Sequence, residues 1–311
     1  MAWRNKVYFT SVVGIGGLFT GIVIEKCKQK NQVYQYECSN CTQGKKLEQI
    51  KILPGLPLFG TVSAASLLDN KSTDVSIVES PTVPTNANRI SEIMRFEKTR
   101  IPHWVFEHLT KESIVYNESV DRSKCEFRED ESLHPFFRSL NTDYRGSGFD
   151  RGHMAAAGNH RKCQKHVDQT FLLSNMAPQV GVGFNRHSWN RLEKYVRKMT
   201  KSYKNVYVCT GPLYLPRKED DGKMYVKYQV IGANTVAVPT HFFKVIVAET
   251  DNNILDMEAY VMPNKPIDDN TPLTVFQVPP ESIERAAGLL FFDQVSRNKL
   301  RHINGRKSTW V

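Results

Sequence analysis

FDRGHMAAAGNH, the stretch from Phe149 to His160, places an acid, an arginine, a glycine and a histidine in direct succession. The turn-rich run YRGSG (144–148) comes before it, so the tetrad Asp150–His153 is predicted to end a short extended segment. Helical periodicity follows further along the chain. We expect the imidazole of His153 to meet a polar group from that helix across a cleft.

The rest of the chain has long strand patterns and few helical ones. In residues 186–203, apolar side chains recur at spacings of three and four, which predicts a helix with one buried stripe. A second helix is predicted over 282–291, behind Pro279 and Pro280. Runs rich in β-branched and aromatic residues predict strands at 205–211, 224–232, 235–249 and 254–262. This order indicates an α+β domain with a mainly antiparallel sheet and flanking helices.

Composition favours a folded protein with an anionic partner. The chain has 311 residues, 40% of them hydrophobic, and a formal net charge of +10. Such an excess of Lys and Arg attracts polyanions, of which nucleic acid and anionic membrane are the two candidates. Six cysteines are too sparse for a disulfide framework, so free thiols are expected. Cys38 and Cys41 have the spacing of half a zinc site, but no matching second half follows nearby.

The first part of the chain has the composition of a targeting sequence. Residues 7–24 carry no charge and are preceded by Arg4 and Lys6, which fits a membrane anchor or a mitochondrial targeting segment over 1–26. Residues 27–87 are rich in Ser, Thr, Asn and Pro and are predicted to be a linker or leader. The folded domain is therefore expected over 88–311.

Four polar residues have the chemistry that phosphodiester hydrolysis needs. A neutral His153 can accept a proton from water, and Arg151 can offer a fork of donors to a phosphate. Asn185 stands at the predicted start of the 186–203 helix, and Glu193 follows eight residues later on the same side. Mg²⁺ accepts such an arrangement, with few protein ligands and retained waters.

Each of these residues also has a structural interpretation. Asn185 can be a helix N-cap, and Glu193 can pair with Arg197 one turn later. His153 can be a satisfied histidine at a strand end, and Arg151 can form an ion pair with its neighbour Asp150. A further alternative is a zinc site. Its candidate ligands are His153, His160, Cys163 and His166.

Three motifs carry a family resemblance. SGFDRGHMAAAGNH, FLLSNMAPQVGVGFN and SWNRLEKY resemble the DNA/RNA non-specific endonucleases of the ββα-metal fold, most closely the mitochondrial members. The resemblance extends over roughly residues 88–295. It implies a ββα-metal nuclease core and a metal-dependent endonuclease that cuts DNA and RNA with little sequence preference. It also implies a homodimer in the mitochondrial intermembrane space or at the inner membrane.

The resemblance assigns roles residue by residue. By the Asp-Arg-Gly-His match, His153 is the general base and Arg151 contacts phosphate. Asn185 is implied as the ligand of one Mg²⁺, with Mn²⁺ as a possible substitute, and Glu193 as the acid next to the ion's water shell. Asn175, in the LSN motif, is implied to order the site. An upstream arginine also contacts phosphate, and the candidates are Arg122 and Arg128.

The chain departs from the family pattern near Arg95. Family members usually have a further segment with a turn and a strand there, whereas Arg95 here runs almost directly into 96–100. The first strand is therefore expected to be missing, which would expose the backbone of its neighbour. This departure supports an alternative function: a catalytically weak or inactive relative that binds nucleic acid or a partner.

Overall fold

The computed structural model describes residues 98–293, 295 and 299–308, together with the backbone of 59–60 and 91–96. All of these belong to one compact unit, Gln43–Val311. The expected anchor segment 1–26 and the Cys38–Cys41 pair lie outside the described residues. Within the described part, no helix is long and apolar enough to cross a membrane. The boundaries at 26 and 87 stay predictions.

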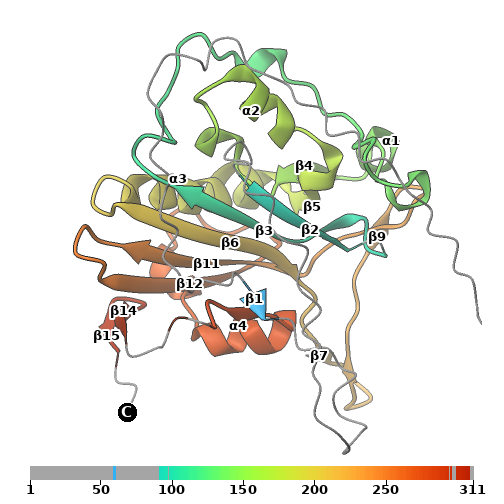
Figure 1. Ribbon diagram of the computed structural model, residues 1–311. Helices are drawn as coiled ribbons and strands as arrows, with labels where there is room; N and C mark the ends of the chain where they lie inside the picture. The colour runs from blue at the N-terminus through green and yellow to red at the C-terminus, as the bar shows by residue number, and fades with distance from the viewer. Residues whose placement is uncertain (1–58, 61–90, 97, 294, 296–298, 309–311) are drawn as a thin grey trace, which may run out of the picture. The chain divides into compact units, whose positions relative to one another are not determined.

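A seven-stranded sheet forms the centre of this unit (Figure 1). Every neighbouring pair in it is antiparallel except β12 and β14, which run parallel. In spatial order the strands are β15 (Arg306–Lys307), β14 (Leu300–Ile303), β12 (Leu255–Pro263), β11 (His241–Glu249), β6 (Asn205–Leu213), β3 (Ile101–Leu109) and β2 (Ser91–Phe96). The predicted α+β class with a mainly antiparallel sheet is confirmed.

Both faces of the sheet are covered, which explains the nearly continuous apolar sequence of β11. Phe242 and Ile246 point to one side, into a core that includes residues of helix α3 (Asn190–Met199). Phe243 points to the other side, into a core that includes Ile283 of helix α4 (Pro280–Ala287). In Figure 1, α4 accordingly lies on the opposite side of the sheet from β4, β5 and α2.

A two-stranded antiparallel sheet and the helix that follows it carry the motifs. Strand β4 (Phe149–His153) pairs antiparallel with β5 (Met176–Val180), which places His153 opposite Met176. The chain then turns at Gly183, whose φ of +82° favours glycine, and a Cβ there would lie 2.9 Å from Cα of Pro266. The π-helical segment η6 (Gly181–Trp189) leads directly into α3. This order of two strands and a helix is the expected ββα core.

Several predicted elements have different limits in the structure. The helix expected over 186–203 begins earlier, within η6, and ends at Met199. The strand expected over 224–232 is wrong: only two-residue strands form there, and neither joins the main sheet. The helix expected to reach Phe291 ends at Ala287, because Gly288 adopts a left-handed conformation with φ of 67°.

The remaining elements are short. They are the strands β1 (Phe59–Gly60), β7 (Arg217–Lys218), β8 (Met224–Tyr225), β9 (Val230–Ile231), β10 (Val236–Ala237) and β13 (Leu290–Phe291), and the helices α1 (Asn141–Tyr144) and α2 (Gln164–Thr170). Strand β1 lies in the expected leader segment, yet it pairs with β13. Cys125, Cys163 and Cys209 are free thiols, as expected for the described cysteines.

The sequence predicts that the first edge strand is missing, but the structure contains a strand at this edge. Residues Ser91–Phe96 form β2, which pairs antiparallel with β3 at the edge of the sheet. A register shift between Met94 and Arg95 marks the point where the sequence departs from the family pattern. The short turn after Phe96 thus still returns the chain into a ladder, and the inner strand β3 is not left as an exposed edge.

Candidate active site

One cavity of about 640 Å³ collects most of the predicted site residues. Its walls include β4, the η6–α3 helix and the loop before α2. Two acids line it, Asp150 and Glu193, against a larger number of cations. The lining cations are Arg122, Arg151, Arg161, Arg186, Lys194 and Arg197. This excess of positive charge suits an anionic ligand such as a phosphate.

His153 lines the cavity from the end of β4. Its ring meets Phe171 edge-on, with centroids 4.7 Å apart, and lies 5.7 Å from the ring of Phe127. Nε2 is buried and has no hydrogen-bond partner among the described residues, which argues against the satisfied-histidine interpretation. Burial, reinforced by the charges of Arg122 and His160, lowers the pKa of His153 to about 3. The imidazole is therefore neutral near pH 7 and able to accept a proton.

Asn185 lies at the beginning of the helix and is held by Asp150. Its Nδ2 donates a hydrogen bond of 2.9 Å to Oδ2 of Asp150. The N-cap position of η6 is held by Val180, and Asn185 lies inside the segment. Asp150 is also bound by Arg186 through Nε at 2.8 Å and Nη2 at 2.6 Å. Burial raises the pKa of Asp150, but the hydrogen bonds from Arg186 and Asn185 outweigh it and leave that pKa below its usual value.

Glu193 lines the same cavity from α3. Burial raises the pKa of this carboxyl, and the charges of Lys244 and Arg197 only partly oppose the effect. The expected one-turn pair with Arg197 is not what the structure forms. Nη1 of Arg197 instead donates a 2.9 Å hydrogen bond to Oδ1 of Asn159.

A hard cation with few protein ligands fits these residues. Because Nδ2 of Asn185 is used by Asp150, the carbonyl oxygen Oδ1 is left without a hydrogen bond among the described residues. Nowhere in the described part of the chain do three His, Cys, Asp or Glu side chains gather as a metal cluster. The zinc alternative is therefore wrong, and Nε2 of its member His160 is bound to Oε1 of Glu107 at 2.9 Å. An amide oxygen with a nearby carboxylate suits Mg²⁺ and its waters.

Of the three arginines predicted to contact phosphate, two line the cavity. Arg151 lines the cavity, with its guanidinium 4.4 Å above the Phe127 ring and Nη1 donating to Oδ1 of Asn141. The alternative in which Arg151 forms an ion pair with Asp150 is wrong, because Asp150 pairs with Arg186. Arg122 also lines the cavity, whereas Arg128 does not. Of the two upstream candidates, the geometry favours Arg122.

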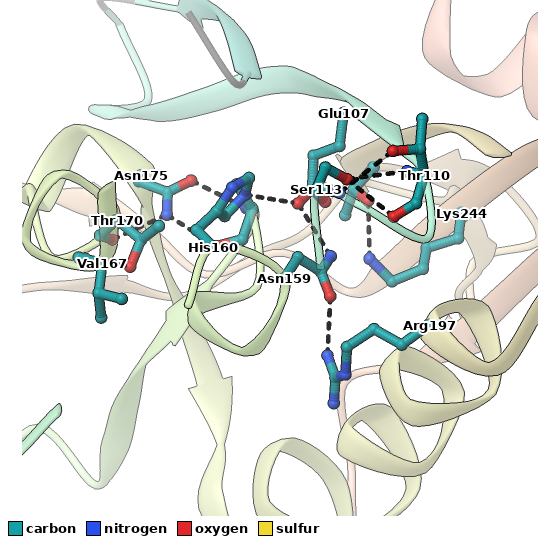
Figure 2. A network of polar contacts seen from close by, with 12 residues as sticks. Glu107, Thr110, Ser113, Asn159, His160, Val167, Thr170, Asn175, Arg197 and Lys244 are labelled. Atoms are coloured by element: carbon teal, nitrogen blue, oxygen red, sulfur yellow. Dashed lines mark hydrogen bonds and ion pairs between the residues drawn. The ribbon is translucent and has the colours of Figure 1, made fainter. Parts of the chain in front are cut away.

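Asn175 supports the site from outside the cavity. It is only 1% exposed, and its side chain clamps the backbone behind His153. Oδ1 accepts from the amide of Ala155 at 2.9 Å, while Nδ2 donates to the carbonyls of Ala155 at 3.0 Å and Thr170 at 2.8 Å (Figure 2). This side chain therefore holds the backbone of Ala155 and Thr170 in place.

A buried polar network holds one cavity wall and was not predicted. Oε1 of Glu107, in strand β3, accepts hydrogen bonds of 2.9 Å from Asn159 and His160, and Asn159 accepts from Arg197 (Figure 2). Lys244, only 2% exposed, donates to Oγ1 of Thr210 at 2.7 Å. Asn159 and His160, at the end of the FDRGHMAAAGNH stretch, were the signal in the sequence that could have indicated this network. A buried Asn or His needs hydrogen-bond partners.

The comparisons with known proteins identify the family. The family described as DNA/RNA non-specific endonuclease matches residues 75–298. The human relative named "Endonuclease G, mitochondrial" is 59% identical over 198 residues, which are 64% of this chain and 66% of the relative. The relative of the same name from Caenorhabditis elegans is 54% identical over 210 residues, 68% of each chain. These are the mitochondrial members that the motifs indicated.

The structural comparison gives the same result. The chain is similar to one in the crystal structure of the EndoG/EndoGI complex, with 70% identity and a TM-score of 0.69. The match covers 70% of this chain and 89% of that one. The curated relatives are matched over about two thirds of their length, at 66% for the human relative and 68% for that of Caenorhabditis elegans.

Proposed function

Because the chain belongs to the DNA/RNA non-specific endonuclease family, we propose that it hydrolyses phosphodiester bonds of DNA and RNA with His153 as the general base. One observation supports this role above the others. The unpartnered Nε2 of a neutral His153 is buried at a cavity lined mainly by cations. A neutral base beside a site for phosphate is what hydrolysis of a phosphodiester requires.

In this proposal, two arginines bind the phosphate and one histidine transfers the proton. Arg151 and Arg122 bind the non-bridging oxygens of the scissile phosphate, and the negative charge of that phosphate raises the pKa of the nearby His153. Nε2 of His153 takes a proton from a water as its oxygen attacks phosphorus. The bond from phosphorus to the 3′ oxygen then breaks, and the 3′ oxygen leaves.

Mg²⁺, with Mn²⁺ as a substitute, is the cofactor we propose for this site. Oδ1 of Asn185 would hold it, and Glu193 would accept hydrogen bonds from its waters. When bound, the ion supplies positive charge where negative charge develops on the phosphate and the leaving oxygen. Asn175 keeps the segment after His153 in place without touching the substrate.

Low sequence preference follows from the composition of the cavity. Its cations meet phosphates, which are the same in every nucleotide, and contacts with phosphates carry no sequence information. The inactive-relative alternative loses its main support, because it depended on a missing edge strand and β2 occupies that position.

Location and assembly are further parts of the proposal. The names of the relatives, together with the uncharged run 7–24 behind Arg4 and Lys6, favour a mitochondrial protein of the intermembrane space or inner membrane. A targeting or anchor segment over 1–26, a linker or leader over 27–87, a nuclease domain over 88–311 and a homodimer are proposed from the sequence and the family resemblance. Detection of the protein in fractionated mitochondria tests the location. The mass of the purified protein in solution tests the homodimer.

Cleavage of plasmid DNA and of an RNA strand at several Mg²⁺ concentrations tests the assignment. His153→Ala and Asn185→Ala should each lower the rate about 10²- to 10⁴-fold. Lys198→Ala is the matched control, because Lys198 is exposed on α3 and does not line the cavity. Unchanged cutting by both site variants would exclude these roles, and absence of cutting by the unaltered protein would exclude the activity.

A further inference from the structure

A second, smaller cavity of about 210 Å³ lies next to the catalytic one. The two share Arg122 and Arg161 in their linings. The second cavity has an apolar part made of Val120 and Val167, which are 7% and 1% exposed. Its remaining lining consists of the Tyr116 ring, which is 57% exposed, and of the polar residues Asp121 and Ser123. A pocket with one apolar wall thus adjoins the catalytic cavity, with two arginines between them.

The position of Tyr116 is fixed by its contacts with the segment that carries Arg161. The Arg161 guanidinium lies over the Tyr116 ring, 5.6 Å from its centroid. Next to it, the amide of Asn117 donates to the carbonyl of Arg161 at 3.2 Å, and Nδ2 of Asn117 donates to the carbonyl of Lys162 at 3.1 Å. The exposed ring is therefore held in place beside an arginine of the catalytic cavity, at little further cost in conformational entropy on binding.

We propose that this second cavity binds a nucleobase of the substrate strand, next to the nucleotide whose phosphate is cut. The proposal rests on the proposed nuclease function and names a subsite of it. A flat base would stack on Tyr116 and the Arg161 guanidinium and cover the two valines, while Arg122 and Arg161 contact the phosphates on either side. A phosphate alone would gain nothing from the valines or the ring.

The chemistry of the pocket also defines the kind of strand. Every base has an aromatic face, so stacking tolerates all sequences, as a non-specific nuclease needs. A base inside a duplex is already stacked between its neighbours, and moving it out costs a few kcal/mol. The subsite therefore favours single-stranded DNA or RNA over a regular duplex.

Binding of labelled oligonucleotides tests the subsite without any cleavage. The full chain is titrated, with chelator present, against a fluorescent single strand and against a strand of equal length made of abasic nucleotides. Tyr116→Ala should weaken binding of the normal strand about tenfold and leave binding of the abasic strand unchanged. Tyr116→Phe, which keeps the ring, should bind the normal strand as the unaltered protein does.

Tyr225 provides a matched control. It is also a surface tyrosine with a cation over its ring, Nζ of Lys227 at 5.1 Å, but it lines neither cavity. Tyr225→Ala should leave both affinities unchanged. An equal loss on normal and abasic strands for Tyr116→Ala, or no loss on either, would overturn the subsite. Because no cutting is measured, this result stands apart from that of the cleavage assay, which alone decides the proposed activity.

Discussion

Asn185 donates a hydrogen bond from Nδ2 to Oδ2 of Asp150, at 2.9 Å, and so joins the start of the helix to the first polar residue of the Asp-Arg-Gly-His tetrad. This hydrogen bond orients the carboxamide so that Nδ2 faces Asp150 and Oδ1 is available to a cation. It also gives a physical reason for an acid at the head of the tetrad. In the proposed site, Asp150 orients the metal ligand Asn185.

Replacing Asp150 by alanine should therefore lower the affinity for Mg²⁺ more than the affinity for substrate. Without its partner the carboxamide of Asn185 can rotate and present its NH₂ group to the cation. The Mg²⁺ concentration for half-maximal cleavage should rise about 10- to 100-fold, as is usual when a group behind a metal ligand is lost. A titration of activity with Mg²⁺ at saturating DNA measures this shift.

Arg186→Ala is the control for that experiment. Arg186 is the other partner of Asp150, through the 2.6 Å and 2.8 Å contacts, and its loss leaves the bond to Asn185 in place. We expect its Mg²⁺ requirement to stay within about twofold of the unaltered protein. If both variants need equally more Mg²⁺, the loss of the Arg186–Asp150 ion pair and not the orientation of Asn185 is the cause.

Asn175 should matter mainly for stability. Asn175→Ala removes a side chain that satisfies two backbone carbonyls and one amide, all in the buried region behind His153. Leaving such groups unsatisfied should lower the free energy of unfolding by roughly 2 to 5 kcal/mol. Urea unfolding measures it, with Asn185→Ala as a comparison that should cost far less. An Asn175→Ala protein of full stability that does not cut nucleic acid would instead indicate direct contact with substrate.

The sequence allows good prediction where a pattern is local. The apolar stripe of the helix could be predicted, because Trp189, Leu192 and Val196 follow one another at helical spacing and all are buried. His153, Asn185 and Glu193 line one cavity because the two strands and the helix that carry them are neighbours in the fold. The tetrad at a strand end and the later helix were therefore enough to predict that these three residues come together.

Contacts between distant residues could not be predicted in the same way. The support of Arg197 by Asn159, and of Asn159 by Glu107, joins three elements, and no spacing in the sequence records which polar groups meet. Strand propensity also misled at 224–232. Its β-branched and aromatic residues are largely exposed there, with Val226 at 52%, because the segment projects as hairpins and does not enter the sheet.

The stability of the protein should depend on pH through His153. Burial lowers its pKa from 6.5 to about 3, so between these values the unfolded chain binds a proton that the folded protein does not. Stability is then highest above pH 6.5 and falls as the pH falls, by at most about 2 kcal/mol at pH 5 for this group. Between pH 7.5 and pH 5, the unaltered protein should lose up to about 2 kcal/mol more of its free energy of unfolding, taken from unfolding curves, than His153→Gln does. Equal losses would mean that His153 is already solvated in the folded state.

Two lysines of α3 allow a test of which cations meet the substrate. Lys194 and Lys198 lie one turn apart and are both exposed, but only Lys194 lines the cavity. Each phosphate contact adds about 0.9 to the slope of log affinity against log salt for duplex DNA. Lys194→Ala should therefore lower that slope by about 0.9, whereas Lys198→Ala should leave it unchanged. Equal slopes for the two variants would show that duplex DNA is held by the general charge of the surface and not by the cavity.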